Sequence, residues 1–368
     1  DMSSELSPSI YTVATTGFEA ACKIPSLPAS HRASRLHGHG FRVKVRAQLP
    51  HAWARFDGSE EDDLLERLEH VVAPLEHCYL NDVIANPTNE NIARSISSQL
   101  DIEADKIAVQ STSREGVDID RSGNAHVWRE FSFEAAHQLP NVEPGHQCGR
   151  MHGHGFKVIL HAHQLLGDAD MAVDLDDLEI LWFMVSPELE FSCLNDIPGL
   201  ENPTSEHLCQ WLWQRLNPEM QALSYVSVYE TATAGCHYDG RKFRIWKDFR
   251  FESALMLNQA PEGEKRRRMH GHSYLVRLHL QAELDEVLGW TIDYGDVKSR
   301  FKPLLAQLDH HTLNALPQLE TPSSSGIAEW IRSRIAQSLP ELDRVDCYTR
   351  RGCGTVLSWA DQGPALPV

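Results

Sequence analysis

The chain has 368 residues, of which 42% are apolar and 23% are charged, and its formal net charge is −18. This length allows two or three domains with a sizeable core. The negative charge argues against a nucleic-acid or membrane-surface binder, and no apolar run approaches the length of a membrane span.

The sequence begins DMSSELSPS and has no basic start followed by an apolar stretch, which predicts no secretory signal. Its eight cysteines are spread along the chain without a C-x-x-C pair. That pattern is typical of free thiols in a reducing compartment rather than of a disulfide framework. We therefore expect a cytoplasmic protein.

His-Gly-His occurs three times, beginning at His37, His152 and His270, with spacings of 115 and 118 residues. Near-equal spacing of this kind indicates an internal repeat. We divide the chain into three expected units, at residues 10–122, 126–240 and 243–360.

Each unit begins with an aromatic-rich strand that contains Phe18, Phe133 or Phe251. A polar loop and the His-Gly-His follow, and then a second strand. In the middle unit, residues 156–161 alternate between apolar and polar or mixed positions, which predicts a half-buried strand. A helical stretch comes next, at residues 297–308 in the last unit.

A turn and then a proline-containing tripeptide, such as Asn202-Pro203-Thr204, precede a second helix. In the middle unit, Leu208, Leu212 and Leu216 recur every four residues on one face of that helix. Strand-like runs such as residues 225–229 close each unit. The order ββααββ predicts an α+β fold, and three such units can close an antiparallel β-barrel, with helices outside, that has no open edges.

The middle unit contains a candidate metal site. His152 and His154 lie two residues apart on a strand and so point to the same face, and we expect Gly153 to keep the backbone slim for an approaching ion. His137, at the end of the preceding strand, is a third ligand candidate. Three histidines and one open position are typical of a catalytic zinc site.

The motifs of the middle unit together resemble 6-carboxytetrahydropterin synthase, which groups with the 6-pyruvoyltetrahydropterin synthases in the tunnelling, or T-fold, group. The resemblance covers nearly the whole chain, three times over. The motifs that carry it are Phe133-Glu134-Ala135-Ala136-His137, Cys148-Gly149-Arg150-Met151-His152-Gly153-His154, Glu201-Asn202-Pro203-Thr204-Ser205-Glu206 and Glu230-Thr231. Three residues separate Cys148 from His152, as in the carboxy-forming, queuosine-pathway branch.

The resemblance implies roles for particular residues. It assigns zinc to His137, His152 and His154, proton transfer to Cys148, and anchoring of the pterin ring to Glu230. In the family an Asp-His pair from the adjacent subunit assists the cysteine.

The three copies hold different parts of this set. The middle unit has Leu189-Glu190-Phe191-Ser192 where the pair belongs, whereas the last unit has an intact pair, Asp309 and His310. The remaining family positions of the last unit are Leu255, Arg266 and Thr349. Those of the first unit are Cys22, Ala33 and Ser111, with the pair Glu76-His77.

We therefore predict one composite site between units 2 and 3, with Glu76 and His77 of unit 1 as the alternative partners if the ring has the other order. Whether Cys22, His37 and His39 bind a second zinc ion stays open. The segment 265–268, Lys-Arg-Arg-Arg, is a solvated loop or, less favoured, a contact for the substrate triphosphate.

The predicted function is a zinc-dependent lyase that converts 7,8-dihydroneopterin triphosphate into 6-carboxytetrahydropterin. A 6-pyruvoyltetrahydropterin synthase-like enzyme and a non-catalytic pterin-binding scaffold are the alternatives. By analogy with the family's hexamers, we expect a homodimer of stacked barrels, with a small pterin as ligand and no nucleic-acid partner.

Overall fold

The computed structural model describes residues 7–165, 170–360 and 362–367, and it contains three successive ββααββ units. Unit 1 comprises β1 (Ser9–Cys22), β2 (His37–Ala47), α1 (Glu60–Val72), α2 (Asn89–Gln99), β3 (Lys106–Thr112) and β4 (Glu115–Asp120). Unit 2 comprises β5 (Asn124–His137), β6 (His152–Leu165), α3 (Leu175–Phe183), α4 (Ser186–Leu189), β7 (Ser192–Cys193), α5 (Ser205–Leu216), β8 (Leu223–Thr231) and β9 (Ala234–Tyr238). Unit 3 comprises β10 (Phe243–Leu255), β11 (His270–Ala282), α6 (Tyr294–Leu308), α7 (Ser324–Ile335), β12 (Leu342–Arg350) and β13 (Cys353–Ser358).

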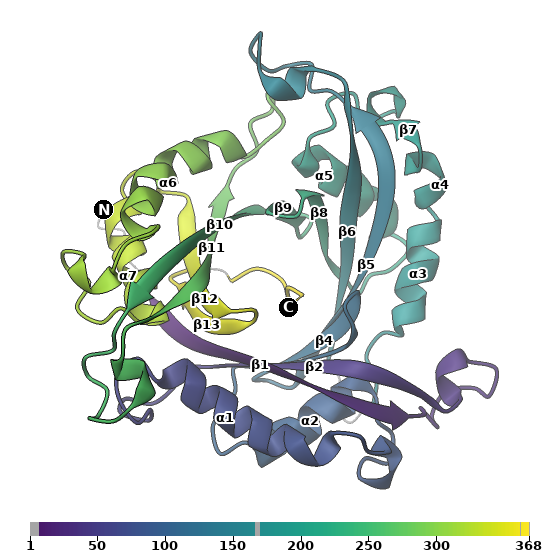
Figure 1. Ribbon diagram of the computed structural model, residues 1–368. Helices are drawn as coiled ribbons and strands as arrows, with labels where there is room; N and C mark the ends of the chain where they lie inside the picture. Colours follow the sequence, from purple (N-terminus) through teal and green to yellow (C-terminus); the bar gives the residue numbers. More distant parts are fainter. Residues whose placement is uncertain (1–6, 166–169, 361, 368) are drawn as a thin grey trace.

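The long strands form one closed antiparallel barrel. Its order is β4-β3-β2-β1-β13-β12-β11-β10-β9-β8-β6-β5, and a β4–β5 pairing closes the ring, while the short β7 pairs in parallel with β5. Neighbouring units are joined by β4–β5, β9–β10 and β13–β1. Figure 1 shows the ring with the helices around its outside, which confirms the predicted α+β barrel.

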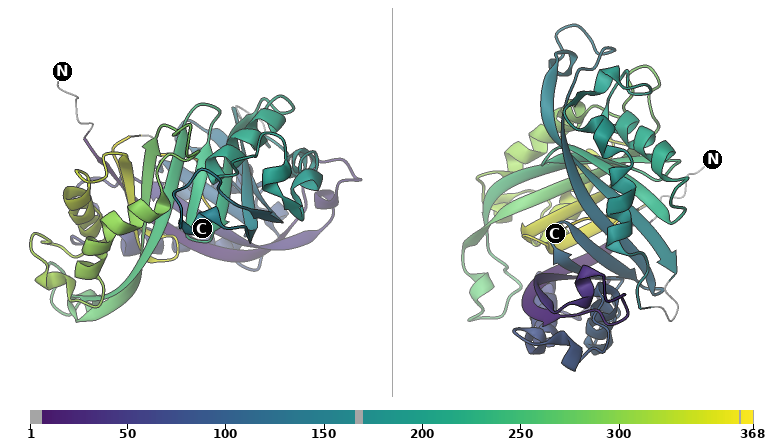
Figure 2. Two further views of the ribbon diagram at one scale, coloured as in Figure 1. Left: turned by 90° about the horizontal axis from the view of Figure 1, so that it is seen from above. Right: turned by 90° about the vertical axis from the view of Figure 1, so that its right-hand side faces the viewer.

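The helices pack on the outer face of the sheet through the apolar residues that their period predicts. Leu208, Leu212 and Leu216 of α5 are fully buried. Ile327, Ile331 and Ile335 of α7 are buried in the same way. Figure 2 shows these helices on the outer side of the strands in both side views. Among the described residues, no helix has both the length and the apolar character needed to cross a bilayer.

The predicted half-burial of β6 is wrong at two positions. Phe156, Val158 and Leu160 face the helices as expected, but Ile159 and His161 are buried as well. They point into the barrel, where Ile159 belongs to a small apolar cluster with Ala365 of the C-terminal segment, and His161 shares a 2.8 Å hydrogen bond with Ser227 Oγ. The yellow C-terminal segment lies inside the ring in Figure 1, so the inner face is covered by the chain itself.

Side-chain caps mark the first residues of five helices. Thr88, Thr204 and Ser323 each accept a backbone N–H from the residue three positions later, at the starts of α2, α5 and α7. Asp174 and Asp293 cap α3 and α6 in a similar way. These caps satisfy N–H groups that a helix leaves unpaired, and they explain why a capping residue precedes each of these five helices.

Candidate active site

The three histidines of unit 2 meet at the end of the β5–β6 hairpin where the connecting loop begins and ends. His137 is paired with His152, and Ala135 with His154, so that all three imidazoles lie on one face. The ring centroids are 4.6 Å apart for His137 and His152, 5.1 Å for His137 and His154, and 4.6 Å for His152 and His154. One donor atom from each ring lies within 4.8 Å of the others.

Hydrogen bonds fix two of these rings for metal binding. His137 Nδ1 lies 2.9 Å from the carbonyl oxygen of Pro203, and His152 Nδ1 lies 2.6 Å from that of Arg150. Nδ1 therefore donates in each ring, and Nε2 has a free lone pair. His137 Nε2 is buried without a hydrogen-bond partner among the described residues, so its lone pair is available to a metal ion.

The electrostatic environment favours the neutral form of His137 and His154. Burial lowers the pKa of His137 to about 4, and the neighbouring imidazoles add to this effect against the Pro203 hydrogen bond. Burial, followed by the proximity of His152, also lowers the pKa of His154. Neutral imidazole is the form that binds Zn²⁺, so the residues present fit a three-histidine metal centre.

Gly153 does not make room for the ion. Its Cβ would point to the face opposite the histidines, because neighbouring residues of a strand alternate. There it would lie 3.6 Å from the carbonyl oxygen of Ala135, an ordinary contact. The sequence-based reason given for this glycine is therefore wrong.

Cys148 lies in a short 3₁₀ turn, Gln147–Gly149, directly before the β6 histidines. Its backbone N–H donates to His146 Nδ1 at 3.1 Å, and its carbonyl oxygen accepts from Leu139 N at 2.8 Å. Burial raises the pKa of the thiol, and the negative charges of Glu230 and Asp293 add to this. These effects favour the protonated thiol.

Two carboxyl groups belong to the site, Glu206, which is buried, and Glu230, which is partly buried. Burial raises the pKa of Glu230, on β8, to about 7, and no described residue donates a hydrogen bond to its carboxylate. Burial raises the pKa of Glu206, in the first turn of α5, to about 8, and its Oε1 atom has no partner among the described residues. Carboxylate oxygens that lack a donor from the protein suit a ligand that brings N–H groups.

Unit 3 closes this site through the start of α6. Asp293 Oδ2 lies 3.3 Å from His146 Nε2, and the ring of Trp290 lies 5.7 Å from that of His146. Tyr294 is partly buried with its hydroxyl oxygen enclosed, and its pKa is raised by burial and by the charge of Glu206. No role for Glu206, Asp293 or Tyr294 was predicted from the sequence. A signal existed for Glu206, because Glu90 occupies the same position of the repeat in unit 1.

Asp309 and His310 lie at the other end of the same helix. Asp309 Oδ1 accepts from Glu252 N at 2.9 Å and lies 3.0 Å from His310 Nδ1. The His310 side chain is 76% exposed. Because α6 has 15 residues, its two ends are roughly 22 Å apart at about 1.5 Å per residue. One chain therefore does not bring this pair to the Asp293 end, where Cys148 lies.

Comparison with known sequences identifies the family. The sequence profile described as 6-pyruvoyl tetrahydropterin synthase matches residues 11–119, 126–241 and 244–358. The chain belongs to this family. It contains three tandem copies of the family unit, as the resemblance in the sequence predicted.

Two relatives in this family carry the carboxy name. A 6-carboxy-5,6,7,8-tetrahydropterin synthase from Synechocystis sp. is 38% identical over 119 residues, which are 30% of this chain and 91% of the relative. A putative 6-carboxy-5,6,7,8-tetrahydropterin synthase from Archaeoglobus fulgidus is 35% identical over 23% of this chain and 70% of the relative. The solved 6-pyruvoyl tetrahydropterin synthase of Caenorhabditis elegans is 22% identical over 32% of this chain and 96% of its own, with a TM-score of 0.30.

The position of the Asp-His pair is structurally the same in all three family units. His77, Phe191 and His310 each have a positive φ, of 52°, 55° and 57°. In each case the backbone N–H donates a hydrogen bond to the backbone carbonyl oxygen of a glutamate in the first strand of the unit, which is Glu19, Glu134 or Glu252 respectively. The left-handed conformation is unfavourable for non-glycine residues, so its occurrence in all three units shows that unit 2 kept the turn while exchanging histidine for Phe191.

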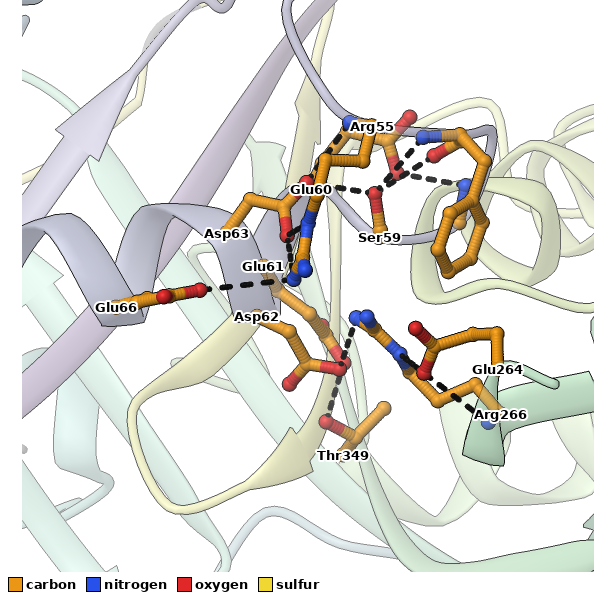
Figure 3. A network of polar contacts seen from close by, with 12 residues as sticks. Arg55, Ser59, Glu60, Glu61, Asp62, Asp63, Glu66, Glu264, Arg266 and Thr349 are labelled. Carbon is orange, nitrogen blue, oxygen red and sulfur yellow. Dashed lines mark hydrogen bonds and ion pairs between the residues drawn. The ribbon is translucent and has the colours of Figure 1, made fainter. Parts of the chain in front are cut away.

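Unit 3 has lost the features that make a ligand site. Leu255 is buried where unit 2 has His137. At the position of Glu230, Thr349 donates a hydrogen bond of 2.6 Å to Glu61 of α1 in unit 1. Arg266 forms an ion pair with Asp62 at 2.9 Å, and its side chain is only 17% exposed (Figure 3). The expectation of a solvated loop is therefore wrong for Arg266, because acidic residues of unit 1 pack against it.

Proposed function

We propose that this protein is a zinc-dependent 6-carboxy-5,6,7,8-tetrahydropterin synthase that acts on 7,8-dihydroneopterin triphosphate, a carbon–carbon lyase of the queuosine pathway. The observation that carries the proposal is the arrangement in unit 2. Cys148, four positions before His152, and the Glu230 carboxylate, which has no donor among the described residues, belong to the same unit as the three clustered imidazoles. The two relatives named for the carboxy product support this choice over the pyruvoyl product.

The residues of unit 2 divide the chemistry between them. His137, His152 and His154 would hold the zinc ion, which as a Lewis acid would make the C–H protons beside the hydroxyls of the substrate side chain more acidic. Cys148 accepts and returns a proton at its Sγ atom, and a nearby cation offsets the burial that keeps the thiol protonated. Glu230 accepts hydrogen bonds from the amide and amino groups of the pterin ring, a planar match of the carboxylate–guanidinium type.

Asp309 and His310 complete the site from a second copy of the chain. In one chain this pair is solvent-exposed, and the length of α6, about 22 Å, separates it from Asp293 at the other end of that helix. A homodimer of barrels stacked end to end can place the pair of one chain beside Cys148 of the other. Asp309 then orients His310 and supports its charged form, as a carboxylate does for imidazole in many active sites.

A cytoplasmic location is part of the same proposal. All eight cysteines are free in the structure. Such a set of thiols suits a reducing compartment, where the Cys148 thiol stays available for proton transfer.

Two variants test the proposed function. Cys148→Ser should keep its bound zinc but lose product formation by about 10²–10⁴-fold, the usual contribution of a positioned acid–base group. His152→Ala should lose both zinc and activity, whereas Cys193→Ser, which changes a thiol outside the site, should lose neither. Mass spectrometry of the product distinguishes the carboxy from the pyruvoyl compound. Full turnover by Cys148→Ser, or a pyruvoyl product, would refute the proposal.

A further inference from the structure

Unit 1 contains a second cluster of metal-ligating side chains. Cys22 ends β1 and is paired with His37 at the start of β2, while Ala20 is paired with His39, the same register as in unit 2. Cys22 Sγ lies 3.6 Å from His37 Nε2, and one donor atom of each residue lies within 4.8 Å of the others. His37 Nδ1 lies 2.7 Å from the carbonyl oxygen of Arg35, which leaves Nε2 for the cluster.

The cluster lies at one end of a cavity of about 600 Å³ between units 1 and 2. Apolar side chains, including Phe41, Val117, Val127 and Val173, form its walls. Polar groups, including Ser111, Asn89 and Glu115, lie among the other lining residues. An open metal position beside an apolar slot with a polar end is the usual form of a small-molecule site.

The carboxylate that lines this cavity, that of Glu115, comes from a different strand of the repeat than Glu230 of unit 2. Ser111 occupies the position of Glu230, and its Oγ donates to Glu115 Oε1 at 3.2 Å. Asn89 Nδ2 in turn donates to Ser111 Oγ at 3.3 Å. The carboxylate has thus moved to the next strand, where unit 2 has Ala234, and it still lines the cavity.

We propose that unit 1 binds a second metal ion through Cys22, His37 and His39, and that its cavity binds a planar heterocycle whose N–H edge meets Glu115. One thiolate and two imidazoles are ligands that Zn²⁺ accepts, with a fourth position open. Ala33 stands where unit 2 has Cys148, so the bound heterocycle meets no thiol for proton transfer. Because Val173 comes from unit 2 and the metal ligands come from unit 1, a heterocycle bound in the cavity would contact both units.

Metal content and spectroscopy test the ion. The full chain should hold two zinc ions, and Cys22→Ser should hold one. After replacement of zinc by Co²⁺, the protein should show the near-ultraviolet charge-transfer absorption of a thiolate–Co²⁺ bond. That absorption should be absent in Cys22→Ser and present in Cys148→Ser and Cys193→Ser.

A conversion variant keeps this test decisive if the serine variant fails to fold. Cys22→His recreates the three-histidine set of unit 2, so it should keep two metal ions and lose the thiolate absorption. One ion in the unmodified chain, or an absorption that persists in Cys22→His, would overturn the proposal.

Neopterin, which is fluorescent, serves as the probe for the cavity. In a chain with His152→Ala and Glu230→Gln, which disable unit 2, one equivalent of neopterin should still bind. Adding Glu115→Gln should weaken that binding about tenfold or more, since hydrogen bonds to a charged group are the strong ones, whereas adding Glu103→Gln at an exposed site should not. No binding, or binding indifferent to Glu115→Gln, would overturn the proposal. Product formation by the unmodified chain tests the proposed reaction separately.

Discussion

Thr349 of unit 3 donates a hydrogen bond of 2.6 Å to Glu61 of unit 1, and Ser324 donates to the other oxygen of the same carboxylate at 3.0 Å. Glu61 thus inserts from α1 at the position where unit 2 presents Glu230 to its site (Figure 3). A carboxylate from the neighbouring unit occupies this end of the unit 3 site, which explains why that copy needs no ligand to satisfy its polar groups.

Glu61 should make stability depend on pH. Burial raises its pKa to about 7, against the hydrogen bond from Thr349. The folded state therefore holds a proton that the unfolded state has released, so this contribution is full below the unfolded pKa of 4.5 and is lost as pH rises through about 7. Glu61→Gln, which resembles the protonated form, should remove this dependence. Between pH 5 and 8, the free energy of unfolding of the unmodified chain should fall relative to the variant by up to about 1.4 kcal/mol per pH unit. Parallel curves from denaturant titrations would contradict this.

Glu230 should make substrate binding depend on pH. Burial raises its pKa to about 7, and only the ionised carboxylate can accept both hydrogen bonds from a pterin edge. KM should therefore rise as pH falls below about 7, approaching tenfold per pH unit, because the competent fraction falls by that factor. Glu230→Gln should have a high KM with little pH dependence. A KM profile of the variant that matches that of the unmodified chain would show that Glu230 does not bind the ring.

The His-Gly-His glycines should differ in their tolerance of alanine. A Cβ on Gly271 would lie 2.8 Å from the carbonyl oxygen of Ser253, whereas one on Gly153 would lie 3.6 Å from that of Ala135. Gly271→Ala should thus lower the unfolding free energy by about 1–3 kcal/mol, the usual cost of overpacking. Gly153→Ala should cost less and keep its metal. Thermal unfolding of the two variants side by side checks this, and an equal loss in both would contradict it.

The repeat made much of the fold predictable from sequence. The period of Leu208, Leu212 and Leu216 is local, and so is the spacing of His152 and His154, and both gave the correct faces. Contacts between units could not be predicted from the sequence. Asp293 meets His146, and Glu61 meets Thr349, only because the barrel closes in one order.

The inner face of the barrel was also hidden from sequence. A strand pattern distinguishes apolar from polar positions, but it does not reveal what covers each face. Ile159 and His161 are buried because neighbouring strands and, next to Ile159, the C-terminal segment fill the ring. Similarly, the pair Asp309-His310 was predicted from its motif, but the contact between Asp293 and His146, which places the opposite end of α6 beside the Cys148 turn, arises only in the folded chain.

The central claim is that Cys148 of one chain works with Asp309 and His310 of another. Two chains carrying different affinity tags, one with Cys148→Ala and the other with Asp309→Asn and His310→Ala, can be co-expressed and purified as the mixed dimer. Each parent homodimer should be nearly inactive. In the mixed dimer, one site combines an intact thiol with an intact pair.

Product formation by this mixed dimer is the most direct test. The account predicts about half of the unmodified activity, because one of two equivalent sites is restored. If the pair acted within its own chain, neither site would be complete. A folded mixed dimer with its zinc bound that is no more active than its parents would contradict the account.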